Sequence, residues 1–134
     1  VGVAMRLIED ALSFAMERTQ FGKPIVEHQL IQAMLADSRA EAFAGRAMVL
    51  EAARSKDRGE KVSLDASCCK LFCSEMVGRV ADRAVQIHGG AGYIAEYAGE
   101  RFYRDVRLFR IYEGTTQIQQ IVIARELARQ AAHA

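Results

Sequence analysis

The stretch "SLDASCCKLFCSEMVGRVADRAVQI", residues 63–87, decides the fold that we expect for this chain. Its apolar residues recur at steps of three and four, the spacing that places side chains on one face of an α-helix. The segment "HGGAGY" follows directly, and its glycines allow the backbone angles that end a helix. We therefore predict a helix over residues 63–87 whose buried face is formed by Cys69, Cys73, Met76, Val80, Ala84 and Ile87.

The same helical spacing continues upstream. Residues 27–58 form a second long pattern, and residues 3–18 a shorter one that ends before the turn "QFGKP". The middle of the 27–58 pattern is built of small residues, which indicates close approach of a neighbouring helix. These small residues are Ser38, Ala42 and Gly45.

Two further helices are predicted downstream, over residues 96–108 and from about Thr116 to the end of the chain. In "TTQIQ" we expect Thr116 to be the N-cap and Gln119 its capping-box partner. The sequence thus predicts an all-α fold, an antiparallel four-helix bundle with a short additional helix, in one domain over residues 1–134.

Composition narrows the classes of function. The 134 residues carry a formal net charge of +1, which argues against nucleic acid as a partner held by bulk charge. Three cysteines lie close together without zinc-site spacing, so free thiols and no metal are expected: Cys68, Cys69 and Cys73. No apolar run approaches the roughly 20 residues that cross a membrane.

The first residues are already in helical register, with no capping residue before Val3. We therefore expect the chain to be part of something longer. No basic segment followed by an apolar one precedes the first helix, so the predicted compartment is the cytoplasm in a bacterium or the mitochondrial matrix in a eukaryote.

Two stretches carry groups that suit a ligand, although each also has a structural explanation. In "ERTQFGKP", Arg18 either binds a phosphate beside the Thr19 hydroxyl or complements the dipole at the end of a helix. In "QIHGGAGY", three glycines either let backbone amides approach a ligand or simply end the helix. His88 beside them is more often a structural residue than a ligand or a base.

A lone acid, Glu113, precedes Gly114 and the start of the last helix in "IYEGTTQIQ". A carboxylate is stabilised by the dipole at such a helix start, so a structural role would be ordinary. A glycine also lets a substrate lie against the backbone, where the carboxylate would remove a carbon-bound proton. Local spacing leaves both explanations open. The arginine series of residues 96–108 and beyond predicts a solvated or ion-paired face: Arg101, Arg104, Arg107 and Arg110.

Four segments in this order and spacing resemble the C-terminal helical domain of acyl-CoA dehydrogenases: "RTQFGKPIVEHQ", "AVQIHGGAGYIAEY", "RFYRDVR" and "IYEGTTQIQ". The resemblance covers nearly the whole chain. It implies a flavoenzyme that oxidises an acyl-CoA thioester to the trans-2-enoyl-CoA, in which a glutamate removes the α-proton and flavin N5 takes the β-hydrogen as hydride. Glu113 matches that catalytic glutamate, and Gly114 matches the position whose backbone touches the substrate.

The same resemblance implies the residues that bind FAD. They are Arg18, Thr19, Gln20, Phe21, Gln29, Gln86, Ile87, His88, Gly89, Gly90, Thr115, Thr116 and Gln117. In the family, the arginine turn and the glycine segment serve the FAD of the neighbouring subunit, which implies a homo-oligomer, a dimer or a tetramer, with shared FAD sites. The usual electron acceptor is an electron-transfer flavoprotein.

Family members also carry an N-terminal helical domain and a middle β-domain, and neither lies within residues 1–134. The isolated chain is therefore expected to be a folded bundle without activity. A di-iron protein is excluded because none of the three histidines follows a glutamate by three residues. A non-catalytic interaction module should have lost the glutamate or the flavin motifs, which are intact, and an acyl-CoA oxidase would differ in passing its electrons to oxygen.

Overall fold

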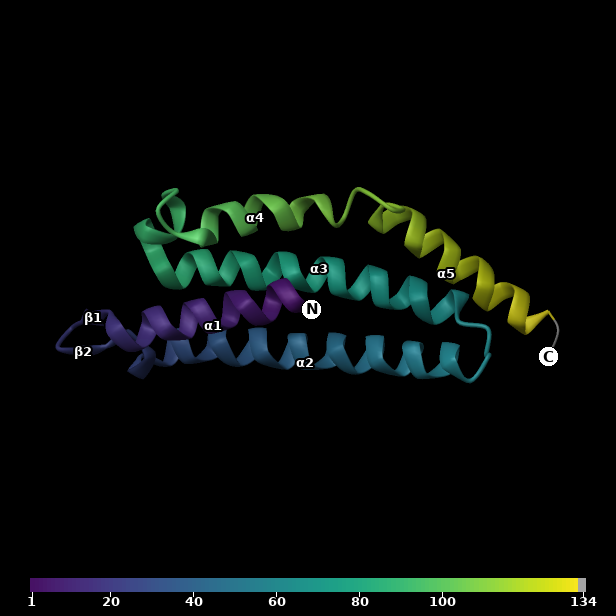
Figure 1. Cartoon of the computed structure of the whole chain (residues 1–134), viewed down its shortest axis with the longest axis horizontal. Helices are drawn as coiled ribbons and strands as arrows, with labels where there is room; N and C mark the ends of the chain where they lie inside the picture. Colours follow the sequence, from purple (N-terminus) through teal and green to yellow (C-terminus); the bar gives the residue numbers. More distant parts are fainter. Residues whose placement is uncertain (133–134) are drawn as a thin grey trace.

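Helix α3, Ser63–His88, forms the centre of the fold, and every other helix packs against it (Figure 1). The computed structural model describes residues 1–132, and all statements about the structure refer to these residues. The other helices are α1 (Gly2–Glu17), α2 (Gln29–Asp57), α4 (Ala98–Leu108) and α5 (Thr116–Ala131).

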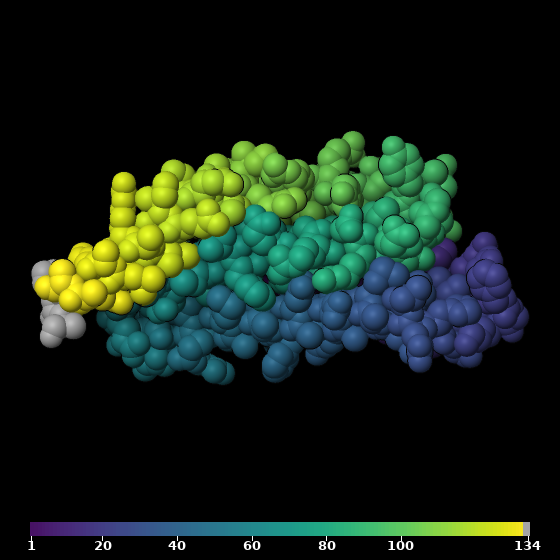
Figure 2. All heavy atoms as spheres, turned by 180° about the vertical axis from the view of Figure 1, so that it is seen from behind, coloured from purple at the N-terminus to yellow at the C-terminus, as the bar shows by residue number. Residues whose placement is uncertain are grey.

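Helices α1, α2 and α3 alternate in direction along the bundle, and the chain then runs back along α3 in two pieces (Figure 1). Helices α4 and α5 follow one another on the same side of α3 and together form the fourth arm. Seen from behind, this arm and α2 lie on opposite sides of α3 (Figure 2). The predicted all-α antiparallel bundle with a short additional helix is confirmed.

The core lies where α1, α2 and α4 meet α3. Its largest fully buried side chains are contributed mainly by α3, and small alanines on α1 allow the two helices to approach each other. Each buried Val, Leu or Met side chain stabilises the fold by about 1.5–3 kcal/mol relative to an exposed one. These side chains are Leu7, Met76, Val77, Val80 and Val106.

The segment between α1 and α2 contains structure that the sequence pattern did not predict. Strands β1 (Thr19–Gln20) and β2 (Lys23–Pro24) pair antiparallel and form a minimal hairpin. A short 3-10 helix, Ile25–Glu27, follows, so α2 begins at Gln29 instead of residue 27. Helix α4 likewise begins two residues later than expected, because the glycine-rich 3-10 segment Gly89–Tyr93 and a turn over residues 94–97 come before it.

The expected cap of the last helix is wrong by one residue. Thr115 is the N-cap, and its hydroxyl accepts a hydrogen bond from the Ile118 N–H at 3.3 Å. Thr116 is already helical, and its hydroxyl donates to Glu75 at 2.6 Å. The Gln119 amide donates to the Glu113 carbonyl at 3.3 Å instead of completing a capping box with Thr116. The contact with α3 therefore decides which threonine caps the helix.

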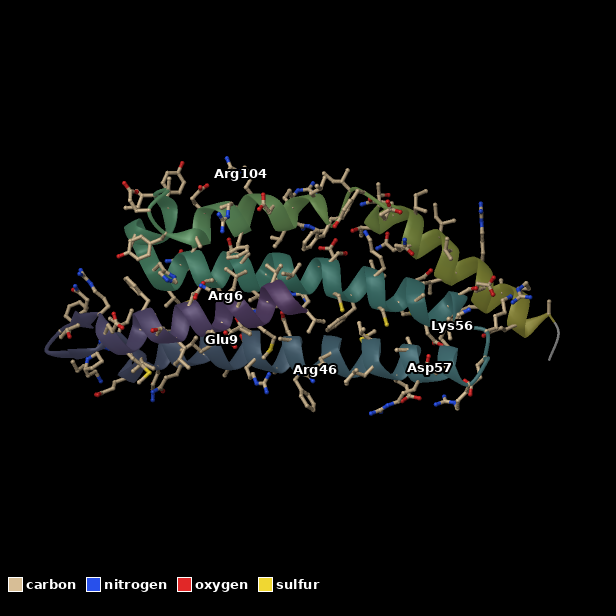
Figure 3. The ribbon with its side chains drawn as sticks, viewed as in Figure 1. Arg6, Glu9, Arg46, Lys56, Asp57 and Arg104 are labelled. Atoms are coloured by element: carbon tan, nitrogen blue, oxygen red, sulfur yellow. The ribbon has the colours of Figure 1, made fainter. Side chains whose placement is uncertain are left out.

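Charged side chains cover the outside of the bundle. Arg46, Lys56 and Asp57 of α2 are exposed and belong to this charged surface (Figure 3). Between α2 and α3, burial disfavours the charged form of Glu41, but hydrogen bonds from Arg83 and Arg79 outweigh it and hold the pKa of Glu41 below its ordinary value.

The described part of the chain contains neither a membrane-spanning helix nor a cluster of metal-binding side chains. None of the helices within residues 1–132 is both long and apolar enough to cross a membrane. The same residues contain no group of three His, Cys, Asp or Glu side chains placed to hold a metal ion, while His133 lies outside the described residues.

Candidate active site

Glu113 lies in the loop that joins α4 to α5, and its backbone is strained. Its φ is +52°, and that of Gly114 is +87°, so two consecutive residues adopt left-handed conformations. This conformation costs a residue with a side chain roughly 1–2 kcal/mol, and such strain persists only where surrounding contacts impose it. A side chain on Gly114 would also collide with Gln119, because an added Cβ would lie 2.6 Å from its amide nitrogen.

Two charged residues of α3 hold this loop from both sides. The Lys70 ammonium donates to the Phe109 carbonyl at 2.5 Å and to the Gly114 carbonyl at 2.9 Å. The Glu75 carboxylate accepts from the Arg110 guanidinium at 3.2 Å and from the Thr116 hydroxyl. Analysis of the sequence missed Lys70 and Glu75. The available signal was two charged residues within the otherwise apolar stretch "CCKLFCSEM".

A mostly apolar hollow of about 310 Å³ opens beside Glu113. Glu113 itself is exposed in this chain. A carboxylate at the edge of an apolar hollow is suitably placed to remove a proton from a carbon atom of a bound ligand. The hollow is lined by Val1, Lys70, Cys73, Ser74, Val77, Phe109, Tyr112 and Glu113.

The hairpin and the glycine segment lie together at the opposite end of α3. The ring of Phe14, in α1, lies 4.5 Å from that of His88, and the Arg18 N–H donates to the Phe14 carbonyl at 2.9 Å. His88 Nδ1 donates to the Ala84 carbonyl at 2.7 Å, so His88 has the structural contacts expected of it. The last turn of α1 therefore packs beside His88, and Arg18 follows this turn directly.

The hairpin tip presents an exposed aromatic ring. Phe21 and Gly22 are the two loop residues, with φ of +53° and +80°, the signs required by a type I′ turn. Phe21 is 93% exposed and occupies a position that favours asparagine or glycine. Its ring lies 6.0 Å from that of His28, whose Nε2 lies 3.3 Å from the Gln20 carbonyl oxygen. A strained, exposed aromatic residue indicates a contact outside this chain.

The glycine segment leaves its first residues open. Added Cβ atoms on Gly89 and Gly90 would meet nothing within 4 Å, whereas one on Gly92 would lie 2.8 Å from the Val85 carbonyl. Gly92 therefore serves packing, and Gly89 and Gly90 leave the backbone accessible.

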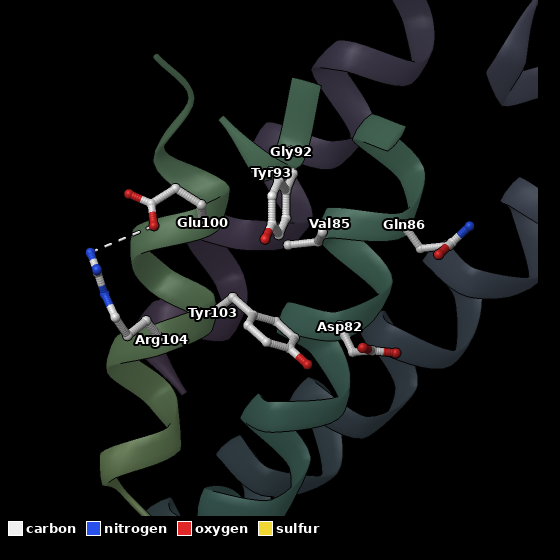
Figure 4. A pocket seen from close by; sticks show the side chains of 8 residues that line it. All are labelled: Asp82, Val85, Gln86, Gly92, Tyr93, Glu100, Tyr103 and Arg104. Carbon is white, nitrogen blue, oxygen red and sulfur yellow. Dashed lines mark ion pairs between the residues drawn. The ribbon is translucent and has the colours of Figure 1, made fainter. Parts of the chain in front are cut away.

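Gln86 lines an adjacent cavity of about 510 Å³ between α3 and α4 (Figure 4). At its edge the Arg104 guanidinium pairs with Glu100 at 3.5 Å, as expected of an ion-paired arginine face. The cavity is lined by Asp82, Val85, Gln86, Gly92, Tyr93, Glu100, Tyr103 and Arg104.

The predicted site residues thus form two groups in one chain. Thr115, Thr116 and Gln117 accompany Glu113, whereas Arg18–Phe21, Gln29 and Gln86–Gly90 lie toward the other end of the bundle (Figure 1). On α3, Lys70 and Gln86 are 16 residues apart, which corresponds to about 24 Å at 1.5 Å per residue. The loop that carries Glu113 and the hairpin of the same chain therefore do not converge on a single small site.

The hairpin end has the chemistry that a phosphate-bearing aromatic cofactor needs. Within residues 1–132 the Arg18 guanidinium has no ion-pair partner, so its charge is available to a phosphate. Phe21 offers an exposed ring, and Gly89 and Gly90 offer an unobstructed backbone. These residues fit the pyrophosphate and ring systems of FAD.

Comparisons with known proteins identify the family of this chain. The family described as "Acyl-CoA dehydrogenase, C-terminal domain" matches residues 1–128. Probable acyl-CoA dehydrogenase YngJ of Bacillus subtilis is 47% identical over 129 residues, covering 96% of this chain and 34% of YngJ. Caffeyl-CoA reductase-Etf complex subunit CarC of Acetobacterium woodii is 44% identical over 129 residues, again 96% of this chain and 34% of the relative.

Solved structures show the same fold. Butyryl-CoA dehydrogenase from Megasphaera elsdenii superposes with a TM-score of 0.93 at 38% identity, over 95% of this chain and 33% of the other. PigA, solved as its FAD complex, superposes with a TM-score of 0.90 at 32% identity, over 93% of this chain and 33% of the other. The chain spans about a third of the length of the curated relatives it matches. On this evidence, the chain belongs to the acyl-CoA dehydrogenase family and has the fold of its C-terminal domain.

Proposed function

We propose that this chain is the C-terminal domain of an FAD-dependent acyl-CoA dehydrogenase in which Glu113 removes the α-proton of the thioester. The observation that carries the proposal is the position of Glu113. Its backbone has a left-handed conformation, and the residue lies at the edge of an apolar hollow in the loop between two helices. Gly114 presents its backbone beside the carboxylate, where the substrate lies. FAD, when bound, supplies the acceptor for the β-hydride.

The residues that hold the cofactor come from two groups. Thr115, Thr116 and Gln117 contact the flavin next to the base, and the hairpin and glycine segment contact the FAD of a neighbouring copy of the protein. The separation of about 24 Å along α3 supports this division. The functional unit is then a homo-oligomer, a dimer or a tetramer, built from a protein that also contains an N-terminal helical domain and a middle β-domain. The 134 residues alone would be inactive.

The reverse reaction is a second candidate, favoured by the reductase name of CarC. Glu113 then gives its proton to the α-carbon, because the same group serves both directions of one reaction. CarC is named as a subunit of an Etf complex, which supports an electron-transfer flavoprotein as the redox partner. An oxidase would instead pass its electrons to oxygen, and the oxygen reactivity of the reduced flavin separates the two.

The test is an anaerobic visible spectrum of the full-length protein that contains this chain, before and after addition of acyl-CoA. Wild type and Glu113→Gln should be equally yellow, because glutamine keeps the shape of the side chain. Only wild type should bleach, because only the carboxylate accepts the α-proton.

Equal bleaching of both proteins would place the base elsewhere. A full-length protein that binds no flavin would favour a non-catalytic interaction module. Return of the yellow colour when an enoyl-CoA reoxidises the dithionite-reduced enzyme, lost in Glu113→Gln, would show that Glu113 also serves the reductase direction.

A further inference from the structure

Lys70 and Glu75 carry opposite charges at the two helix ends that flank Glu113. Phe109 is the C-cap of α4, and its carbonyl accepts from the Lys70 ammonium. Thr116 is the first residue of α5, and its hydroxyl donates to the Glu75 carboxylate. A positive charge suits the carbonyl end of a helix, and a negative charge suits the amide end.

The contacts of Lys70 and of Glu75 span two overlapping segments of the chain, residues 109–114 and 110–116. Lys70 joins Phe109 to Gly114, and Glu75 joins Arg110 to Thr116. Each of these segments therefore contains Glu113 and begins and ends within four residues of it. Ammonium and carboxylate hydrogen bonds of this kind are stronger than those between neutral groups. No other charged side chain of α3 reaches this loop within the described residues.

Lys70 also leaves the Glu113 carboxylate free. Its two hydrogen bonds go to backbone carbonyls, and within residues 1–132 no ion pair joins Lys70 to Glu113, although both line the same hollow. A lysine paired with the carboxylate would compete with a substrate proton for it. The geometry therefore fixes the backbone of Glu113 and keeps its oxygens available.

We infer that Lys70 and Glu75 are positioning residues that hold the left-handed Glu113–Gly114 backbone, and thereby aim the carboxylate. This inference rests on the proposed function for its catalytic part. Neither residue is expected to contact the thioester or to exchange a proton with it. Their effect comes through the loop, whose strain persists only while its ends are held.

The experiment compares five forms of the full-length protein: wild type, Lys70→Met, Lys70→Arg, Glu75→Leu and the control Lys56→Met. Lys56 is exposed near the end of α2. Its replacement changes the net charge by the same amount as Lys70→Met but does not affect the contacts of the loop around Glu113. Four quantities are measured: the flavin content, the KM for acyl-CoA, the rate of flavin reduction at saturating acyl-CoA, and hydrogen–deuterium exchange in residues 109–116 and in the other helices.

Lys70→Met should reduce flavin on the order of 100-fold more slowly than wild type, because a displacement of about 1 Å at the reacting atoms costs about this factor. Its flavin content and its KM should stay within about twofold of wild type. Exchange should rise in residues 109–116 and stay unchanged in α1 and α2. Lys70→Arg should recover part of the rate, and Lys56→Met should match wild type. Glu75→Leu should repeat the effect on exchange.

Reduction by Lys70→Met within about threefold of wild type would overturn the inference. So would an exchange increase spread equally over all helices, which would indicate a loss of global stability. If the wild-type flavin is not reduced at all, the proposed function fails. The exchange of residues 109–116 then still decides whether Lys70 holds the loop.

Discussion

A Cβ atom placed on Gly45 of α2 would lie 3.2 Å from the sulfur of Cys73 on α3, and equally close to the terminal methyl of Met76. Ordinary contacts between such atoms are wider. The two longest helices therefore approach each other so closely that a side chain at this position would require Cys73 and Met76 to shift.

Gly45→Val should destabilise the full-length protein by about 1–3 kcal/mol, the usual cost of overpacking a core. Gly45→Ala should cost less, because alanine gains about 1 kcal/mol of helix propensity over glycine and the Met76 methyl can move. Denaturant unfolding measures both. In a Cys73→Ala background the alanine at position 45 should become stabilising, and a penalty that stays the same would contradict the contact with sulfur.

Gly114→Ala should lower both stability and flavin reduction, because alanine disfavours φ of +87° and its Cβ would meet the Gln119 amide. Gly59→Ala is the matched control, since Gly59 has φ of +79° but open space around it. Each should cost about 1 kcal/mol or more in unfolding free energy. Only Gly114→Ala should slow reduction of the flavin by acyl-CoA, and equal activities would argue against a role for this loop.

Phe21→Asn should stabilise the hairpin by about 1 kcal/mol, because asparagine followed by glycine is the preferred pair of a type I′ turn. Under the proposed function, the same change should weaken binding of FAD to the apoprotein several-fold, because the exposed aromatic contact, worth about 0.5–1.5 kcal/mol, is lost. Thermal unfolding of the apoprotein and titration with FAD measure the two effects. A variant with unchanged FAD affinity would show that the strain at Phe21 has another cause.

Stability should fall in acid partly through Glu41. Because Arg83 and Arg79 depress the pKa of Glu41, its contribution is complete above the ordinary glutamate pKa near 4.5 and is lost as the pH falls below it. Glu41→Gln should therefore lower the melting temperature at pH 7 and make it less sensitive between pH 5 and pH 3. Melting curves across this range test the point, with the exposed Glu9→Gln as the control. A parallel acid loss in Glu41→Gln and wild type would contradict it.

The sequence predicted the helices and their packing because long amphipathic patterns repeat often enough to be recognised. It missed the hairpin because strands of two residues, Thr19–Gln20 and Lys23–Pro24, are too short to show alternation. The helix cap was wrong because Thr115 and Thr116 are equivalent by local pattern. Only the contact of Thr116 with Glu75, 41 residues away, distinguishes them.

The candidate site followed the same division. Glu113 was found as an unusual acid before a glycine, but its local spacing did not separate a base from a helix cap, and the family resemblance supplied the choice. Lys70 escaped notice because its partners, Phe109 and Gly114, lie 39 and 44 residues away in the sequence. Hydrogen bonds to backbone carbonyls leave no trace in the identity of the partner residues.

The continuity of helix α3 also restricts how the sequence of this protein can evolve. The helix is continuous from Lys70 to Gln86. The distance along it from the Glu113 loop to the glycine segment is therefore set by the number of residues between these two positions. One inserted residue would shift the far end by about 1.5 Å and rotate it by about 100°. Substitutions that keep the apolar face leave that distance untouched. Between these two positions the gene should therefore tolerate codon substitutions far better than insertions or deletions of whole codons.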